Sequence, residues 1–124
     1  MHKELIYIFI GGGTGSVLRY MVQQLLHERI VPYHFPWATF VVNLLGSFLI
    51  GLFYTLSDRF NLSPEVRLFL TTGLCGGFTT FSAFSNDGVT LLKGGFYGTF
   101  LLYTLLSVGI GVMAAVSGGM LLRR

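Results

Sequence analysis

The chain has 124 residues, of which 52% are hydrophobic and only 10% are charged, and its formal net charge is +3. An ordinary soluble domain carries about 25% charged residues, so the composition excludes a soluble globular domain as the default. The basic balance does not indicate a nucleic-acid partner, because no basic stripe with interleaved aromatic residues lies outside the apolar stretches. We therefore predict an integral membrane protein whose surroundings are the lipid bilayer.

The charged residues cluster at the boundaries of four long apolar stretches, at about 5–26, 37–56, 64–92 and 96–122. Each stretch is long enough to cross the hydrocarbon core of a bilayer as a helix, which takes about 20 residues. The sequence thus predicts an all-α fold in which residues 1–124 form a single transmembrane domain with four spans.

The first span contains a GGGTG segment at 11–15 and, one helical turn later, Arg19. An arginine cannot lie bare in lipid. Its side chain must snorkel to the interface, pair with an acid such as Asp87, or point into a water-filled vestibule. A positively charged vestibule would concentrate anions.

The second span follows a short polar link, 27–36, in which Pro36 stands where a helix commonly begins. Asn43 lies near the middle of this otherwise apolar span, where an amide is costly to bury and usually faces a partner or an aqueous cavity. Ser47 lies one helical turn further, and Gly46 lets a neighbour approach closely. For Asn43, an interhelical hydrogen bond and a role as a hydrogen-bond donor to an anion in a pore both remain open.

The third span begins with a Ser-Pro-Glu start signal at 63–65 and has a centre rich in glycine and hydroxyl groups, TTGLCGGFTTFSAFSND. We predict that this helix is broken near mid-membrane at Gly76 and Gly77, where the freed backbone groups would line a site. The carbonyl oxygens of Gly76 to Thr79 would then suit a hard monovalent cation such as sodium, because no carboxylate is near. The alternative is that the glycines only allow close helix packing.

Two aromatic side chains follow the expected break. Phe81 and Phe84 are three residues apart, and Thr80 and Phe84 are four apart, so the rings share a helix face with a hydroxyl group. Phenylalanine ordinarily packs in a core, but the electropositive edge of its ring can contact an anion without binding it tightly. Asp87 ends this polar stripe.

The fourth span is long and apolar, with Tyr103, Thr104 and Ser107 as its polar members. The positive charges around the spans give a weak orientation signal, four against two, that slightly favours both termini inside. A chain that inserts either way would show the same pattern. The charges counted are Lys3, Arg59, Arg123 and Arg124 on one side and Arg29 and Lys93 on the other.

Enzymatic function has no support in the motifs. The GGGTGS segment is only superficially like a dinucleotide fingerprint, because Ser16 takes the place of its last glycine. The sequence also has no phosphate-binding loop, no Ser-His-Asp set and no metal-spaced His or Cys cluster. Cys75 is the only cysteine, and its apolar setting indicates a small packing residue. We therefore expect a protein that is not an enzyme.

Three segments together, GGGTGSVLRY, WATFVVNLLGSFLIGL and GLCGGFTTFSAFS, closely resemble the Fluc (CrcB) family of fluoride channels, in the same order and in a chain of the same length. The resemblance covers essentially the whole chain. It implies a dual-topology homodimer in the bacterial inner membrane, with two antiparallel subunits, two fluoride pathways and a structural sodium ion on the two-fold axis. Such a channel would export fluoride and so reduce its toxicity.

The resemblance also implies roles for individual residues. Phe81 and Phe84 would be the paired phenylalanines of the pathway, Asn43 a donor in it, and Arg19 the arginine of the vestibule. The carbonyl oxygens of Gly76 and Thr79 would be the sodium ligands. Ala83 stands where the family commonly has Thr, and Asp87 stands where Glu is usual, so the details of the hydroxyl track differ from the family pattern. The candidates for that track are Thr80, Ser82, Ser85, Tyr103 and Ser107.

Two other functions fit a short four-span chain. A proton-coupled exporter of small drugs would need an acidic residue deep in the first span, and that span has none after Glu4. A non-conducting assembly protein would use the glycines for helix packing alone.

Overall fold

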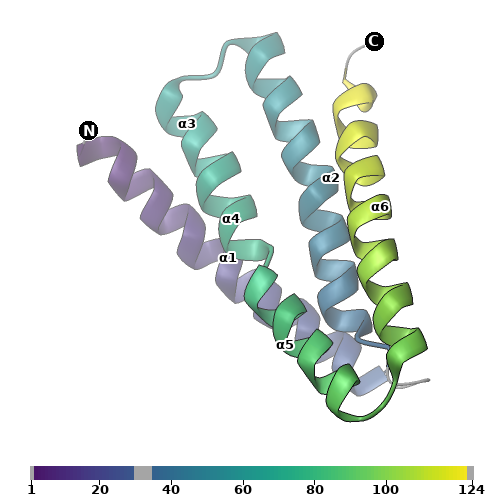
Figure 1. The fold of residues 1–124 in the computed structure, drawn as a ribbon. Helices are drawn as coiled ribbons and strands as arrows, with labels where there is room; N and C mark the ends of the chain where they lie inside the picture. The colour runs from purple at the N-terminus through teal and green to yellow at the C-terminus, as the bar shows by residue number, and fades with distance from the viewer. Residues whose placement is uncertain (1, 30–34, 123–124) are drawn as a thin grey trace.

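The computed structural model describes residues 2–29 and 35–122, and the regular elements in that part of the chain are all helical (Figure 1). Three helices, α1 (His2–Arg29), α2 (Trp37–Phe60) and α6 (Tyr97–Leu121), are long and apolar enough to cross a membrane. They correspond to the expected first, second and fourth spans, so the prediction of an all-α fold is confirmed.

The ends of these helices follow from local chemistry where the structure describes them. Pro36 immediately precedes α2, and its carbonyl oxygen accepts the amide of Phe40 at 3.1 Å. Residues 30–34 of the link, and the basic pair Arg123 and Arg124, lie outside the described residues.

The expected third span is divided into four segments, α3 (Pro64–Leu68), a π-helical segment η1 (Phe69–Cys75), α4 (Gly76–Phe78) and α5 (Phe81–Lys93). Its start is the one expected, because the Ser63 hydroxyl accepts the amide of Val66 at 3.3 Å and Pro64 takes the first helical position. The prediction of a discontinuous third helix is thus confirmed, while its crossing of the membrane stays a prediction.

Glycines set the distance between α1 and the segments η1 and α4. A Cβ atom on Gly15 would overlap the carbonyl oxygen of Leu74, and one on Gly77 would overlap the carbonyl oxygen of Gly12. The two backbones are therefore in direct contact, which only glycine permits. For Gly77 the alternative hypothesis, that the glycine allows close helix packing, is therefore confirmed.

α2 and α6 lie side by side on the other flank of the molecule (Figure 1). Here too glycines face backbone, since a Cβ atom on Gly51 or on Gly118 would meet the carbonyl oxygen of Ala115 or of Phe48. The glycines thus form two interfaces, one between α1 and the broken helix and one between α2 and α6. These interfaces place α1 and α6 on opposite flanks of the molecule.

A small aromatic core ties α5 to the beginnings of α2 and α6. Phe40, Leu91 and Tyr103 are its buried members, and Phe84 packs against them. Most other large apolar side chains are exposed, and the three candidate spans bury only 6% to 22% of their most apolar windows. Outward-facing apolar side chains on long helices suit a bilayer as solvent.

Candidate functional site

The broken helix is interrupted at Thr79 and Thr80, not at Gly76 and Gly77 as expected. Thr79 (φ −83°, ψ 158°) and Thr80 (φ −152°, ψ 114°) are both extended, whereas Gly76 (φ −61°, ψ −39°) is helical. The reason is that Gly77 serves the contact with α1, while Thr80 has the side chain that starts the next helix. Its hydroxyl oxygen accepts the amide of Ala83 at 3.1 Å and so forms the N-cap of α5.

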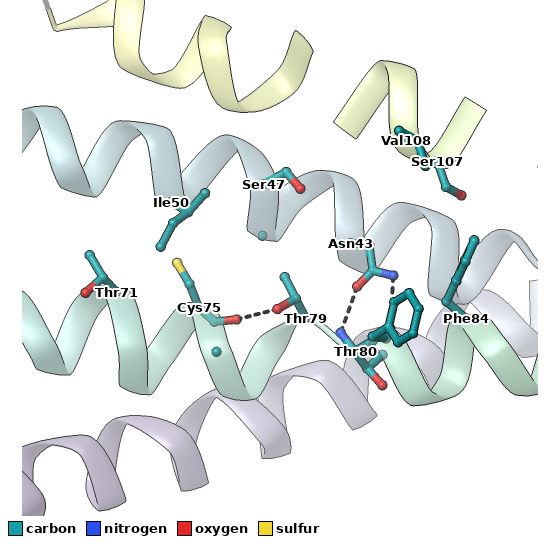
Figure 2. Close-up of a pocket in the computed structure, with 13 residues that line it drawn as sticks. Asn43, Ser47, Ile50, Thr71, Cys75, Thr79, Thr80, Phe84, Ser107 and Val108 are labelled. Atoms are coloured by element: carbon teal, nitrogen blue, oxygen red, sulfur yellow. Dashed lines mark hydrogen bonds between the residues drawn. The ribbon is translucent and has the colours of Figure 1, made fainter. Parts of the chain in front are cut away.

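Asn43 of α2 forms hydrogen bonds with both backbone polar groups of Thr80 at this break (Figure 2). Its Oδ1 accepts the amide of Thr80 at 2.8 Å, and its Nδ2 donates to the carbonyl oxygen of Thr80 at 3.2 Å. The interhelical hydrogen bond considered for Asn43 therefore exists. Because an NH2 group carries two hydrogens, the amide keeps a second donor beyond the one given to Thr80.

The carbonyl oxygens that the break releases include those of Gly76 and Thr79. The amide of Thr80 would bond to Gly76 in an unbroken helix but donates to Asn43 instead, and the amide of Ala83 donates to Thr80 Oγ1 instead of to Thr79. Within the described part of the chain, no cluster of three His, Cys, Asp or Glu side chains could hold a metal ion. Neutral carbonyl oxygens at the end of a half-helix are ligands that fit sodium in broken-helix membrane proteins.

A cavity of about 410 Å³ opens beside the break between α2, the broken helix and α6. It brings together seven of the residues predicted for the site, whereas Arg19, Ser82, Ser85 and Tyr103 do not line it. Its lining also includes Ser47, Thr71 and Cys75. Cys75 is buried, in agreement with the small packing residue that its apolar setting indicated. The seven predicted residues are Asn43, Gly76, Thr79, Thr80, Phe81, Phe84 and Ser107.

Phe81 and Phe84 lie next to each other but differ in their surroundings. Their ring centroids are 5.7 Å apart, and the Phe84 ring lies 5.0 Å from that of Tyr103. Phe84 belongs to the aromatic core, while Phe81 is 78% exposed. Tyr103 is fully buried, and its hydroxyl group donates to Asp87 at 3.3 Å. Tyr103 therefore stands behind Phe84 as seen from the cavity.

The other hydroxyl candidates, Ser82, Ser85 and Ser107, lie in three different places. Ser107 Oγ is buried at the cavity and has no hydrogen-bond partner among the described residues, and Ser82 Oγ lies 3.2 Å from Thr80 Oγ1. Ser85 instead lines a second cavity of about 320 Å³, between α5 and α6, with Thr104 as its other hydroxyl. Phe84 lines both cavities and stands between them.

Arg19 of α1 contacts the break from the side opposite Asn43. Its Nε donates to the carbonyl oxygen of Gly77 at 3.2 Å, and its Nη1 donates to Gln23 Oε1 at 3.3 Å. The alternative of a pair with Asp87 is not found among the described residues, where Arg19 donates to Gly77 and Gln23 and Asp87 accepts from Tyr103. Ser16 donates to the same Gly77 oxygen at 3.5 Å, and the sequence analysis did not predict this contact. The signal was its position three residues before Arg19, which places both side chains on one face of α1.

Comparison with known proteins places the chain in a family. The family profile described as "CrcB-like protein, Camphor Resistance (CrcB)" matches residues 6–119. A protein of Bacteroides fragilis is 60% identical over 121 residues, which is 96% of this chain and 95% of the relative. One of Phocaeicola vulgatus is 51% identical over 116 residues, 94% of this chain and 95% of the relative. One of Flavobacterium psychrophilum is 49% identical over 117 residues, 94% of each chain.

Each of these relatives is named "Fluoride-specific ion channel FluC". Ion channels are not enzymes, so the family agrees with the expectation that this protein is not an enzyme. The apolar helices and the channel relatives together identify a multi-pass membrane protein. Since the profile and the relatives extend over almost its whole length, the chain belongs to the CrcB family.

Proposed function

We propose that this chain is a fluoride-selective ion channel of the bacterial inner membrane, built as an antiparallel homodimer with two pathways and one structural sodium ion. The observation that carries the proposal is the cavity beside the helix break, where Asn43, Thr80 and Ser107 meet the rings of Phe81 and Phe84. The identity of the ion comes from the relatives named as fluoride-specific channels.

The chemistry of this cavity suits a small, strongly hydrated anion. A pathway for such an ion must replace its water with donors and yet release it again. The second N–H of Asn43 and the unpartnered hydroxyl of Ser107 are donors of this kind. The ring edges of Phe81 and Phe84 add weak electropositive contacts that do not hold the ion firmly.

The exposure of Phe81 supports a second copy of the chain. A single chain leaves this ring 78% exposed beside polar groups, so the cavity has no wall on that side. Lipid tails would have to cover both the ring and the neighbouring hydroxyls, which is unfavourable because tails offer no hydrogen bonds. An antiparallel partner would close the same face by bringing its own break to the centre of the pair.

The sodium ion would be held by the carbonyl oxygens of Gly76 and Thr79, two from each subunit. When bound, it would supply a positive charge near the centre of the dimer and so offset the cost of bringing an anion there. Asn43 and the N-cap of Thr80 keep the two carbonyl oxygens free of helical hydrogen bonds.

The direction of transport follows from the membrane potential. A channel does no work on the ion, and an interior-negative potential drives an anion outward by about 2.3 kcal/mol per 100 mV. A passive fluoride pathway in the inner membrane would therefore lower the internal fluoride concentration.

Liposomes loaded with potassium fluoride or potassium chloride test the proposal. The purified full-length protein is reconstituted, valinomycin is added, and the efflux of each halide is followed with an ion-selective electrode. We expect fast fluoride efflux and negligible chloride efflux. Efflux of neither ion from correctly assembled protein would overturn the channel proposal in favour of an assembly protein, and drug efflux that needs a proton gradient would favour an exporter.

A further inference from the structure

Three residues on one face of α1 lie along the broken helix. Gly11, Gly15 and Arg19 follow one another at intervals of four, which places them on one stripe of the helix. The two glycines touch backbone, because Cβ atoms there would overlap the carbonyl oxygens of Phe69 and Leu74. The stripe therefore brings Arg19 to the end of α4, where the third helix breaks.

Arg19 replaces a backbone donor at that point. In an unbroken helix the carbonyl oxygen of Gly77 would accept the amide of Phe81, but Phe81 begins α5 after the extended pair. The Nε of Arg19 donates to this oxygen at 3.2 Å instead. Gln23, one turn further along α1, accepts from Nη1 at 3.3 Å and holds the guanidinium group in place.

The break is thus held from two sides. Arg19 holds Gly77 from α1, and Asn43 holds Thr80 from α2 with two hydrogen bonds. Gly76 directly precedes Gly77, which Arg19 holds, and Thr79 directly precedes Thr80, which Asn43 holds. Any movement of Gly77 or Thr80 would change the direction of the Gly76 and Thr79 carbonyl groups.

We propose that Arg19 is a positioning residue, which fixes the end of α4 and thereby the carbonyl oxygens of Gly76 and Thr79, and that it does not act as a free cation that attracts anions. The inference rests on the sodium site proposed above. Its physical basis is that the guanidinium group donates to two acceptors of the protein, the backbone oxygen of Gly77 and Oε1 of Gln23, and does not line the cavity. A charge-assisted hydrogen bond of this kind is stronger than a neutral one.

The lengths of the side chains allow the two roles to be separated. In Arg19→Gln the amide nitrogen stands at the same place along the side chain as Nε of arginine, so the donor to Gly77 stays and the charge is lost. Arg19→Met has the same reach without a donor. Arg19→Lys keeps the charge and moves the donor one bond further out. Arg59→Met is the matched control, because Arg59 also donates to a backbone carbonyl, that of Leu122, at the far end of α2.

The readout is the thermal unfolding midpoint of the full-length protein in detergent, titrated with sodium chloride against N-methylglucamine chloride at constant ionic strength. Fluoride efflux from liposomes is recorded in parallel. We expect Arg19→Met to raise the sodium concentration of half-maximal stabilisation by about tenfold, as the loss of one charge-assisted hydrogen bond implies. Arg19→Gln should stay close to the unsubstituted protein, and Arg59→Met should leave the sodium midpoint unchanged.

Other outcomes overturn the inference. If Arg19→Gln and Arg19→Met behave alike while Arg19→Lys matches the unsubstituted protein, the charge is what matters and Arg19 is not a positioning residue. If sodium stabilises all the variants equally, the inference fails and the sodium site stands. If the unsubstituted protein conducts fluoride without any response to sodium, the sodium site fails together with the inference, while the channel function stands.

Discussion

Phe81 and Phe84 are both phenylalanines and lie three positions apart, yet only Phe84 is part of the core of a single chain. The Phe84 ring packs on Tyr103, so its replacement would disturb the fold as well as the cavity. The Phe81 ring lines the cavity but is 78% exposed. A change at Phe81 therefore reports on the pathway with the least effect on the packing of a single chain.

Phe81→Ile should reduce fluoride efflux at least about tenfold, because isoleucine keeps apolar bulk but removes the ring edge that contacts the anion. The measurement is the liposome efflux of the variant at equal reconstituted protein. Phe9→Ile is the control, since Phe9 is 74% exposed and lies on α1 away from the cavity. Efflux from Phe81→Ile equal to that of the control would remove the ring from the pathway.

The family resemblance predicted several of the residues that gather at the cavity but not which hydroxyl groups face it. Asn43, Phe81 and Ser107 line it together. The cost of a polar group inside an apolar span had singled out Asn43, whereas the resemblance had pointed to Phe81 and Ser107. Ser85 was expected to share the track and instead lines the second cavity with Thr104. Neighbouring positions on a helix point about 100° apart, and only the placement of α6 decides which of them faces which cavity.

At the scale of elements, the closest contacts between α1 and the broken helix are between backbones, at glycines, and Ser16 and Arg19 add side-chain hydrogen bonds to Gly77. The sequence shows the glycines but not which of them make these contacts, since that depends on the neighbour opposite each one. The expected break at Gly76 and Gly77 illustrates the limit, because Gly77 is a contact glycine and the break falls at the next threonine pair. The π-helical segment Phe69–Cys75 was not predicted either, as local sequence does not distinguish one helical hydrogen-bond register from the next.

Gly15→Ala should lower the stability of the folded protein by about 1–3 kcal/mol or more, because the new methyl group would overlap the carbonyl oxygen of Leu74 and force α1 from the broken helix. Gly13→Ala is the matched control, since its Cβ atom would meet nothing within 4 Å. Thermal unfolding in detergent compares the two variants. Equal midpoints would mean that the backbone contact of α1 does not hold the broken helix.

The whole molecule presents unequal ends. Both described termini and the link between α2 and α3 lie at the same end (Figure 1), with Lys3, Arg59 and Arg67 among their basic residues. Arg67, which the orientation count from the sequence omitted, lies in α3 beside the ring of Tyr54, 5.2 Å from its centroid. Lys93 belongs to the opposite end. The described structure thus strengthens the bias toward one orientation, against which the antiparallel pairing has to be tested.

An antiparallel homodimer requires both orientations in equal numbers, so about half of the chains should expose the N-terminal end to either side of the membrane. His2→Cys on a Cys75→Ser background provides one exposed thiol at that end. Spheroplasts are labelled with a membrane-impermeant thiol reagent before and after permeabilisation. Labelling of about half the chains before permeabilisation supports the dual orientation, whereas one-sided labelling of a conducting protein contradicts it.

Lys93→Gln increases the charge difference between the ends, so it should reduce the minority orientation and the fluoride efflux of the same cells together.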